Sequence, residues 1–112
     1  MAQQPSYRTE RVNELMKREL VMLLRKEVND PRLQGVIITD VITSRDLSSA
    51  RVFFSCAEDE QKKVSTLLYK ASGFFRTRLS KVLDLRHTPT LSFIYDTAPN
   101  AGARIEDLLS KL

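Results

Sequence analysis

Residues with side chains that could catalyse a reaction are few in this chain of 112 residues. It contains one histidine, His87, and one cysteine, Cys56. A zinc site needs several His or Cys ligands, and a nucleophilic site needs a base beside its nucleophile, so neither can be assembled. The three glycines are far apart in the chain, which excludes a glycine-rich loop that holds phosphate groups. The sequence therefore predicts a protein that is not an enzyme and holds no metal or cofactor.

Positive charge gathers in one stretch, Lys62 to Pro89. This stretch has seven basic residues and one acidic residue, a net charge of +6, whereas the whole chain has a net charge of +4. A basic protein with a pI near 9.5 favours an acidic partner, either nucleic acid or an anionic surface. Because the charge is localised, we expect that partner to meet the segment 62–89.

The same stretch predicts two helical segments joined at Ala71-Ser72-Gly73. Apolar residues recur at helical spacing in both segments: Val64, Leu67, Leu68 and Ala71, and then Phe75, Leu79, Val82 and Leu83. A glycine in a helical pattern costs about 1 kcal/mol relative to alanine, so it usually has a backbone role. We therefore predict that Gly73 permits a bend and the close approach of another backbone.

On the second segment, Phe74, Arg78 and Lys81 fall on the side away from the apolar stripe. An aromatic ring between two cations suits stacking on an unpaired base beside phosphate contacts. The alternative is that the cations only solvate the helix while Phe74 packs under the bend, but the concentration of charge favours nucleic-acid contact. The predicted RNA-binding residues are Arg45, Lys63, Lys70, Ser72, Gly73, Phe74, Arg76, Arg78, Lys81 and Arg86.

A first helix should precede this pair and pack against it. Thr9 can cap it, and it should end before Pro31, because proline disfavours helical backbone in the preceding residue. Its apolar stripe predicts a buried face, formed by Val12, Leu15, Met16, Leu20, Leu23 and Leu24. Residues 1–6 are polar and are predicted to be disordered.

Three strands are predicted, at residues 36–43, 50–56 and 91–95. The first has apolar residues on both sides, so both faces are expected to be partly covered; Val36, Ile38 and Ile42 share one side, and Ile37 and Val41 the other. The second alternates cleanly, which predicts that Cys56 is a small buried residue rather than a nucleophile. After a loop at 96–102, apolar residues at 105, 108, 109 and 112 predict a short terminal helix.

The chain length fits a single domain over residues 1–112. One cysteine suggests a reducing compartment, and the chain has neither a secretory signal nor an apolar run long enough to span a bilayer. We therefore expect a cytoplasmic monomer that does not contact a membrane. The last residues, Ser110-Lys111-Leu112, match a peroxisomal address, but Leu112 already belongs to the stripe of the terminal helix, so the structural interpretation is favoured.

The predicted order, helix-strand-strand-helix-bend-helix-strand, resembles an α+β, three-stranded KH-like domain of type II with a short C-terminal helix. A typical KH domain joins its adjacent helices by a GXXG loop that clamps the nucleotide backbone. This chain has Ala71-Ser72-Gly73 there instead. That departure and three stretches resemble the ribosome-binding factor A family, over about Arg8 to Leu109. The stretches are Asp30-Pro31-Arg32-Leu33-x-Gly35, then Ile38-Thr39-Asp40-Val41 with Ser44-Arg45-Asp46-Leu47-x-x-Ala50, and Leu85-Arg86-x-x-Pro89-x-Leu91-x-Phe93.

The resemblance implies a bacterial factor that binds the free 30S ribosomal subunit late in its assembly. It implies contact with 16S rRNA, with ribosomal proteins as further partners, and support for 16S 5′-end maturation and for growth in the cold. It also implies release with help from a ribosome-associated GTPase, and no chemistry of the factor's own. The alternative function is a protein-interaction module whose basic face meets an acidic protein.

Overall fold

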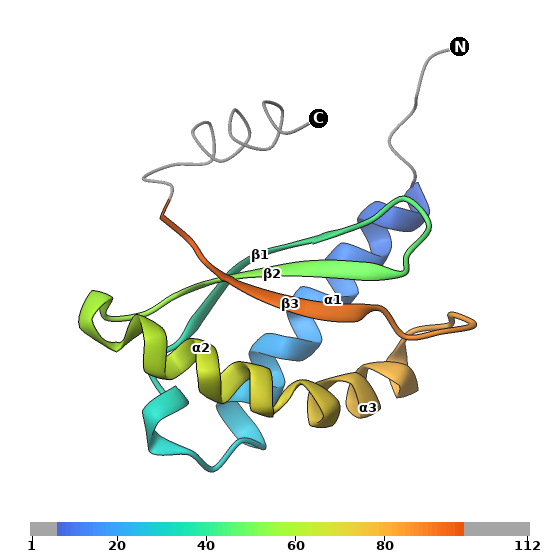
Figure 1. Ribbon diagram of the computed structural model, residues 1–112. Coiled ribbons are helices and arrows are strands. Elements are labelled where there is room, and N and C mark those ends of the chain that lie inside the picture. The colour runs from blue at the N-terminus through green and yellow to red at the C-terminus, as the bar shows by residue number, and fades with distance from the viewer. Residues whose placement is uncertain (1–6, 98–112) are drawn as a thin grey trace.

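The computed structural model of the protein describes residues 7–97 (Figure 1). The predicted disorder of residues 1–6, the predicted terminal helix at 105–112 and the Ser110-Lys111-Leu112 match lie outside the described residues. Between residues 7 and 97, no helix is long and apolar enough to cross a membrane.

The order of elements agrees with the prediction. The elements are α1 (Tyr7–Lys26), the 3-10 turn η1 (Pro31–Leu33), β1 (Ile37–Thr43), β2 (Ser49–Ser55), the 3-10 turn η2 (Glu58–Glu60), α2 (Gln61–Lys70), α3 (Ser72–Val82) and β3 (Thr90–Tyr95). Helix α1 begins two residues before Thr9, so the predicted cap is wrong: nothing in Tyr7-Arg8 disfavours helical backbone, and the helix continues through them.

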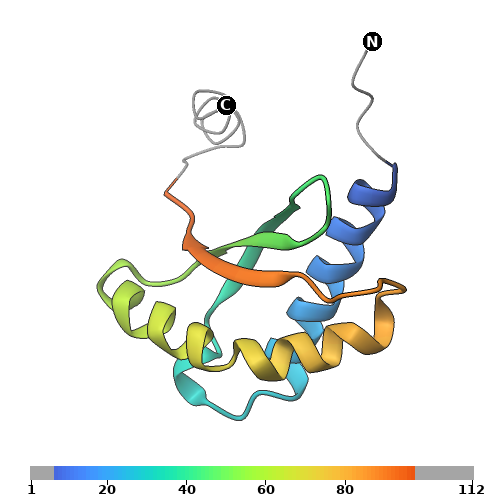
Figure 2. The ribbon, with the colours of Figure 1, turned by 45° about the vertical axis from the view of Figure 1, so that its right-hand side comes forward.

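The three strands form one mixed sheet in the order β1-β2-β3. Strand β1 is antiparallel to β2, and β2 is parallel to β3. A parallel pair needs a long crossover, which the segment α2–α3 supplies. The three helices cover one face of the sheet (Figure 2). The fold is therefore α+β and KH-like, as predicted.

A β-bulge decides which residues of β1 face the core. Ile38 pairs with Phe54 and Asp40 pairs with Phe53, so one residue of β1 is left over between them. This extra residue puts Ile38, Val41 and Thr43 on the buried side, although Ile38 and Val41 are an odd number of positions apart. The predicted grouping by strict alternation is wrong for this reason.

Two residues of the predicted apolar stripes are exposed instead of buried. Leu15 on α1 is 37% exposed and Val82 on α3 is 43% exposed. The buried stripe of α3 is narrower than predicted, because Phe75, Leu79 and Leu83 recur every four residues and leave Val82 beside them. The helices still bury a continuous core against the sheet, which fixes the outward direction of their remaining side chains.

Cys56 lies just beyond the end of β2 and is half-buried, so the prediction of a buried strand residue is wrong. Burial raises the pKa of its thiol, and the negative charges of Glu60 and Asp59 raise it further. A raised pKa disfavours the thiolate, which is the nucleophilic form of cysteine.

Candidate nucleic-acid interface

Helices α2 and α3 follow one another with almost no break in backbone hydrogen bonding. The N–H of Ala71 donates to the carbonyls of Leu67 and Leu68, at 3.0 and 3.1 Å, and the carbonyl of Ala71 accepts from the N–H of Phe75 at 3.0 Å. The Ser72 hydroxyl donates to the carbonyl of Tyr69. The two helices therefore present a nearly continuous outer side, with the junction at Ala71.

Gly73 does not make the bend. It lies in the first turn of α3, its φ is not positive, and a Cβ built on it meets no atom within 4 Å. The prediction that Gly73 permits a bend and the close approach of another backbone of this chain is wrong, because Ala71 makes the junction with right-handed backbone angles. What Gly73 does provide is a stretch of exposed helix surface without a side chain.

Replacing Gly73 by Ala should therefore stabilise the isolated protein by about 0.5–1 kcal/mol, since alanine favours helix over glycine and has room here. Urea denaturation of the two proteins measures this. Lower stability of Gly73→Ala would contradict the description of Gly73 as an unconstrained helical residue. RNA affinity measured in parallel reports on the interface. A loss of affinity together with a gain in stability would show that a partner, and not the fold, requires a residue without a side chain at position 73.

Phe74 and Arg78 lie together, as their spacing predicts. The guanidinium carbon of Arg78 is 5.4 Å from the centre of the Phe74 ring, and the ring is 38% exposed. The same guanidinium forms an ion pair with Glu27 of α1, at 3.0 Å. Phe74 is therefore available to a partner, whereas the charge of Arg78 is partly neutralised by an acid distant in sequence.

Arg76 projects from the opposite flank of α3, toward the segment before β3. Its Nε donates to the carbonyl of Pro89 at 3.1 Å, and one terminal nitrogen donates to the carbonyl of Thr88 at 2.9 Å. This guanidinium holds the α3–β3 connection against the helix. The structure thus gives Arg76 a structural role in addition to its predicted phosphate contact.

Replacing Arg76 by Met keeps the aliphatic stem and removes both hydrogen bonds. The carbonyls of Thr88 and Pro89 would lose charged donors, so we expect a loss of about 1–3 kcal/mol in the free energy of unfolding. Urea denaturation checks this, with Lys81→Met as the control for loss of one exposed charge. Equal stability of the two variants would contradict the structural role of Arg76.

Lys70 and Lys81 are exposed, and neither forms an ion pair or side-chain hydrogen bond with any residue between 7 and 97. Lys70, Phe74, Arg78 and Lys81 are spaced three or four residues apart, so they follow one ridge of the helical pair. We call this ridge, with Gly73, the outer helical face. Among the cations of this face, Lys70 and Lys81 have no partner between residues 7 and 97, whereas Arg78 is paired.

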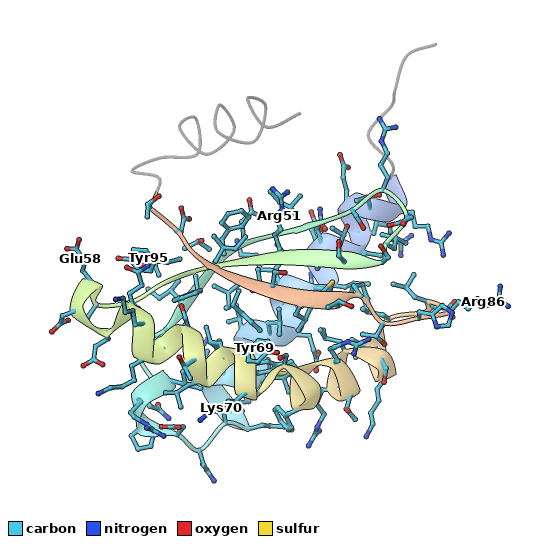
Figure 3. The ribbon with its side chains drawn as sticks, in the orientation of Figure 1. Arg51, Glu58, Tyr69, Lys70, Arg86 and Tyr95 are labelled. Carbon is cyan, nitrogen blue, oxygen red and sulfur yellow. The ribbon has the colours of Figure 1, made fainter. Side chains whose placement is uncertain are left out.

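Tyr69, at the end of α2, was missed by the sequence analysis. It is 75% exposed and lies next to Lys70 (Figure 3). The sequence could have predicted this exposure, because Tyr69 does not belong to the buried stripe of Val64 and Leu68. An aromatic residue outside the core stripe of an amphipathic helix faces solvent. It adds a second ring that an unpaired base could stack on beside the outer helical face.

Of the other predicted cations, one is already paired and two lie away from this face. Lys63, in the first turn of α2, is paired with Glu60 at 3.7 Å. Arg45 is in the β1–β2 loop and Arg86 in the α3–β3 loop. Figure 3 shows Arg86 at the end of the molecule opposite Glu58. The structure therefore divides the predicted set between the helical pair and one end of the sheet.

The architecture and this surface define a KH-like domain with a basic outer helical side, in which Ala71-Ser72-Gly73 stands at the position of the GXXG loop. A model of the family described as "Ribosome-binding factor A" matches residues 8–109. The chain therefore belongs to the ribosome-binding factor A family.

Individual relatives agree with this membership. The chain is 63% identical over 110 residues to ribosome-binding factor A of Vesicomyosocius okutanii, covering 98% of this chain and 96% of that protein. It is 62% identical to the protein of the same name from Ruthia magnifica, which it covers completely. The crystal structure of ribosome-binding factor A from Thermus thermophilus has the same fold, with a TM-score of 0.73 and 23% identity over 80% of this chain and 98% of that one.

Proposed function

We propose that this protein binds the 30S ribosomal subunit late in its assembly, through 16S rRNA and without catalysing a reaction. The observation that carries the proposal is the family match over residues 8–109. A structural similarity supports the proposal. A homology model of Thermus thermophilus ribosome binding factor A, which was fitted into the cryo-EM map of a 30S complex with that factor, has a similar fold. Its TM-score to this chain is 0.61, with 20% sequence identity over 87% of this chain and all of that one.

The outer helical face suits this role chemically. Its lysines can contact phosphate groups, and Phe74 and Tyr69 can stack on unpaired bases. Such contacts recognise the shape of a folded RNA more than its sequence. A binder of this kind acts by stabilising one rRNA conformation over others, and that bias matters most when misfolded helices rearrange slowly, as they do in the cold.

The proposal includes the finer functions that the family implies. The protein acts in the cytoplasm as a monomer and supports processing of the 16S 5′ end. Ribosomal proteins are further partners, and a ribosome-associated GTPase assists its release. The competing function is a protein-interaction module that binds an acidic polypeptide with the same basic face.

Sedimentation of the tagged protein with ribosomal fractions tests the central proposal: it should migrate with free 30S subunits. Affinity for naked 16S rRNA and for an acidic polypeptide, compared across a salt titration, separates the two functions.

Cells lacking the protein should accumulate free small subunits with unprocessed 16S 5′ ends, increasingly so as the temperature falls. Expression of the Cys56→Ser variant in these cells should restore normal small subunits, because the proposed binding surface does not include Cys56. Normal subunit profiles in the cold would contradict the assembly function.

A further inference from the structure

A second basic site lies at the end of the sheet where the loops that carry Arg45 and Arg86 line one hollow. Three segments distant in sequence line a hollow of about 420 Å³ there. They are the first turn of α1 with Arg8, the β1–β2 loop with Arg45 and Asp46, and the α3–β3 loop with Leu85, Arg86 and His87. This volume is within the range of about 300–1,000 Å³ that small-molecule sites occupy.

The hollow has an excess of permanent positive charge. Arg8, Arg45 and Arg86 are exposed, and none of them forms an ion pair with another residue between 7 and 97. Guanidinium groups stay charged in proteins and repel one another, so three of them around one hollow favour an anionic ligand. Their planar donors match the oxygen atoms of a phosphate group.

The one carboxylate among the lining residues, Asp46, offsets only part of this charge, because three arginines and one aspartate leave a net charge of +2. Asp46 Oδ1 accepts from the Ser44 hydroxyl at 2.7 Å, from the Ser48 hydroxyl at 2.7 Å and from the Ser48 N–H at 3.0 Å. These hydrogen bonds, that from the Ser48 side chain first, lower the pKa of Asp46 to about 2. Asp46 is thus engaged in shaping its own loop.

The β1–β2 loop is held in one conformation. Among residues 7–97, Leu47 is the only residue other than glycine with a positive φ, 62°, a conformation that costs roughly 1–2 kcal/mol. Its side chain is buried in the core, which stabilises this backbone. The Ser48 carbonyl accepts from the N–H of Thr90 at 3.0 Å, which ties the loop to β3. Strained and well-anchored backbone of this kind gathers at ligand-binding sites, and here it places Arg45 at the hollow.

We propose that this hollow binds one nucleotide of a single-stranded RNA segment, with its phosphate among Arg8, Arg45 and Arg86 and its base against the His87 ring and Leu85. The inference rests on the proposed function, and it adds to the outer helical face a distinct site for an unpaired nucleotide. An imidazole ring and an apolar side chain supply the stacking surface that unpaired bases use in RNA-binding domains.

Titration of the full chain with 5′-AMP, followed by NMR, tests the site. AMP should shift the signals of Arg45, Arg86 and His87. The double variant Arg45→Gln/Arg86→Gln should weaken AMP binding at least tenfold, whereas the matched variant Lys17→Gln/Arg18→Gln, with the same loss of charge on the exposed side of α1, should bind AMP like the unmodified protein. For single-stranded RNA, each lost phosphate contact should also reduce the log–log salt slope by roughly 0.7.

Three results would overturn the inference. They are unchanged AMP affinity in Arg45→Gln/Arg86→Gln, binding of inorganic phosphate as tight as that of AMP, and displacement of AMP by an acidic peptide at lower concentration than by RNA. Should the double variant fail to fold, Arg8→Gln tests the same site from a different element. Sedimentation separates this failure from that of the proposed function: a protein that migrates with 30S subunits but ignores AMP refutes only the nucleotide site.

Discussion

Changing Lys70 and Lys81 together to Glu should reduce rRNA affinity by more than roughly tenfold at low salt while leaving the fold intact. Both side chains are exposed on the outer helical face, and neither has a partner between residues 7 and 97, so their removal exposes no unsatisfied group. Each phosphate contact that is lost should flatten the log–log salt dependence by roughly 0.7 to 0.9. A filter-binding titration at several salt concentrations gives both quantities.

The matched control is Lys17→Glu/Arg18→Glu. These two residues are exposed on α1 and the substitutions change the net charge equally, so the control measures the effect of overall charge alone. Arg78 is a poorer choice for reversal, because Arg78→Glu would place a second carboxylate beside Glu27, its present ion-pair partner. Equal affinity and salt slope in the two double variants would contradict the placement of the interface on α2 and α3.

Local periodicity was enough to predict most of the fold. Helical spacing identified Met16, Leu20, Phe75 and Leu79 as core residues, and the order of elements followed from it. The facing of β1 could not be predicted, because a bulge depends on the pairing with β2, which alternation within one strand does not contain.

The candidate site divides in the same way. Phe74 and Arg78 are four residues apart on one helix, so their contact follows from helix geometry. The ion pair of Arg78 with Glu27 joins residues 51 positions apart, and it depends on how α1 crosses α3. The hydrogen bonds of Arg76 likewise depend on the path of the α3–β3 connection. Sequence spacing could find the cations of this surface, but not which of them the fold already uses.

The neighbouring phenylalanines at the start of α3 should respond in opposite ways to replacement by alanine. Phe75 is fully buried, with its ring centre 5.7 Å from that of Phe74 and 5.8 Å from that of Phe93 of β3. Truncating a buried phenylalanine costs about 3–5 kcal/mol, because it leaves a cavity. Since domains are stable by only about 5–15 kcal/mol, Phe75→Ala should unfold a measurable fraction of the protein.

Phe74→Ala should instead leave the fold nearly unchanged and weaken RNA binding. The ring is 38% exposed, and its contacts with Arg78 and with the Phe75 ring contribute roughly 1–2 kcal/mol to the folded state, well below the cost expected for Phe75→Ala. A base stacked on it would add about 1–3 kcal/mol to the affinity for RNA. Urea denaturation and RNA titration of both variants separate the two roles: Phe75→Ala should lower the unfolding midpoint far more than Phe74→Ala, and Phe74→Ala should lower the RNA affinity of a protein that is still folded. Unchanged RNA affinity in Phe74→Ala would show that this ring is not a stacking surface, and an equal loss of stability in the two variants would show that Phe74 belongs to the core.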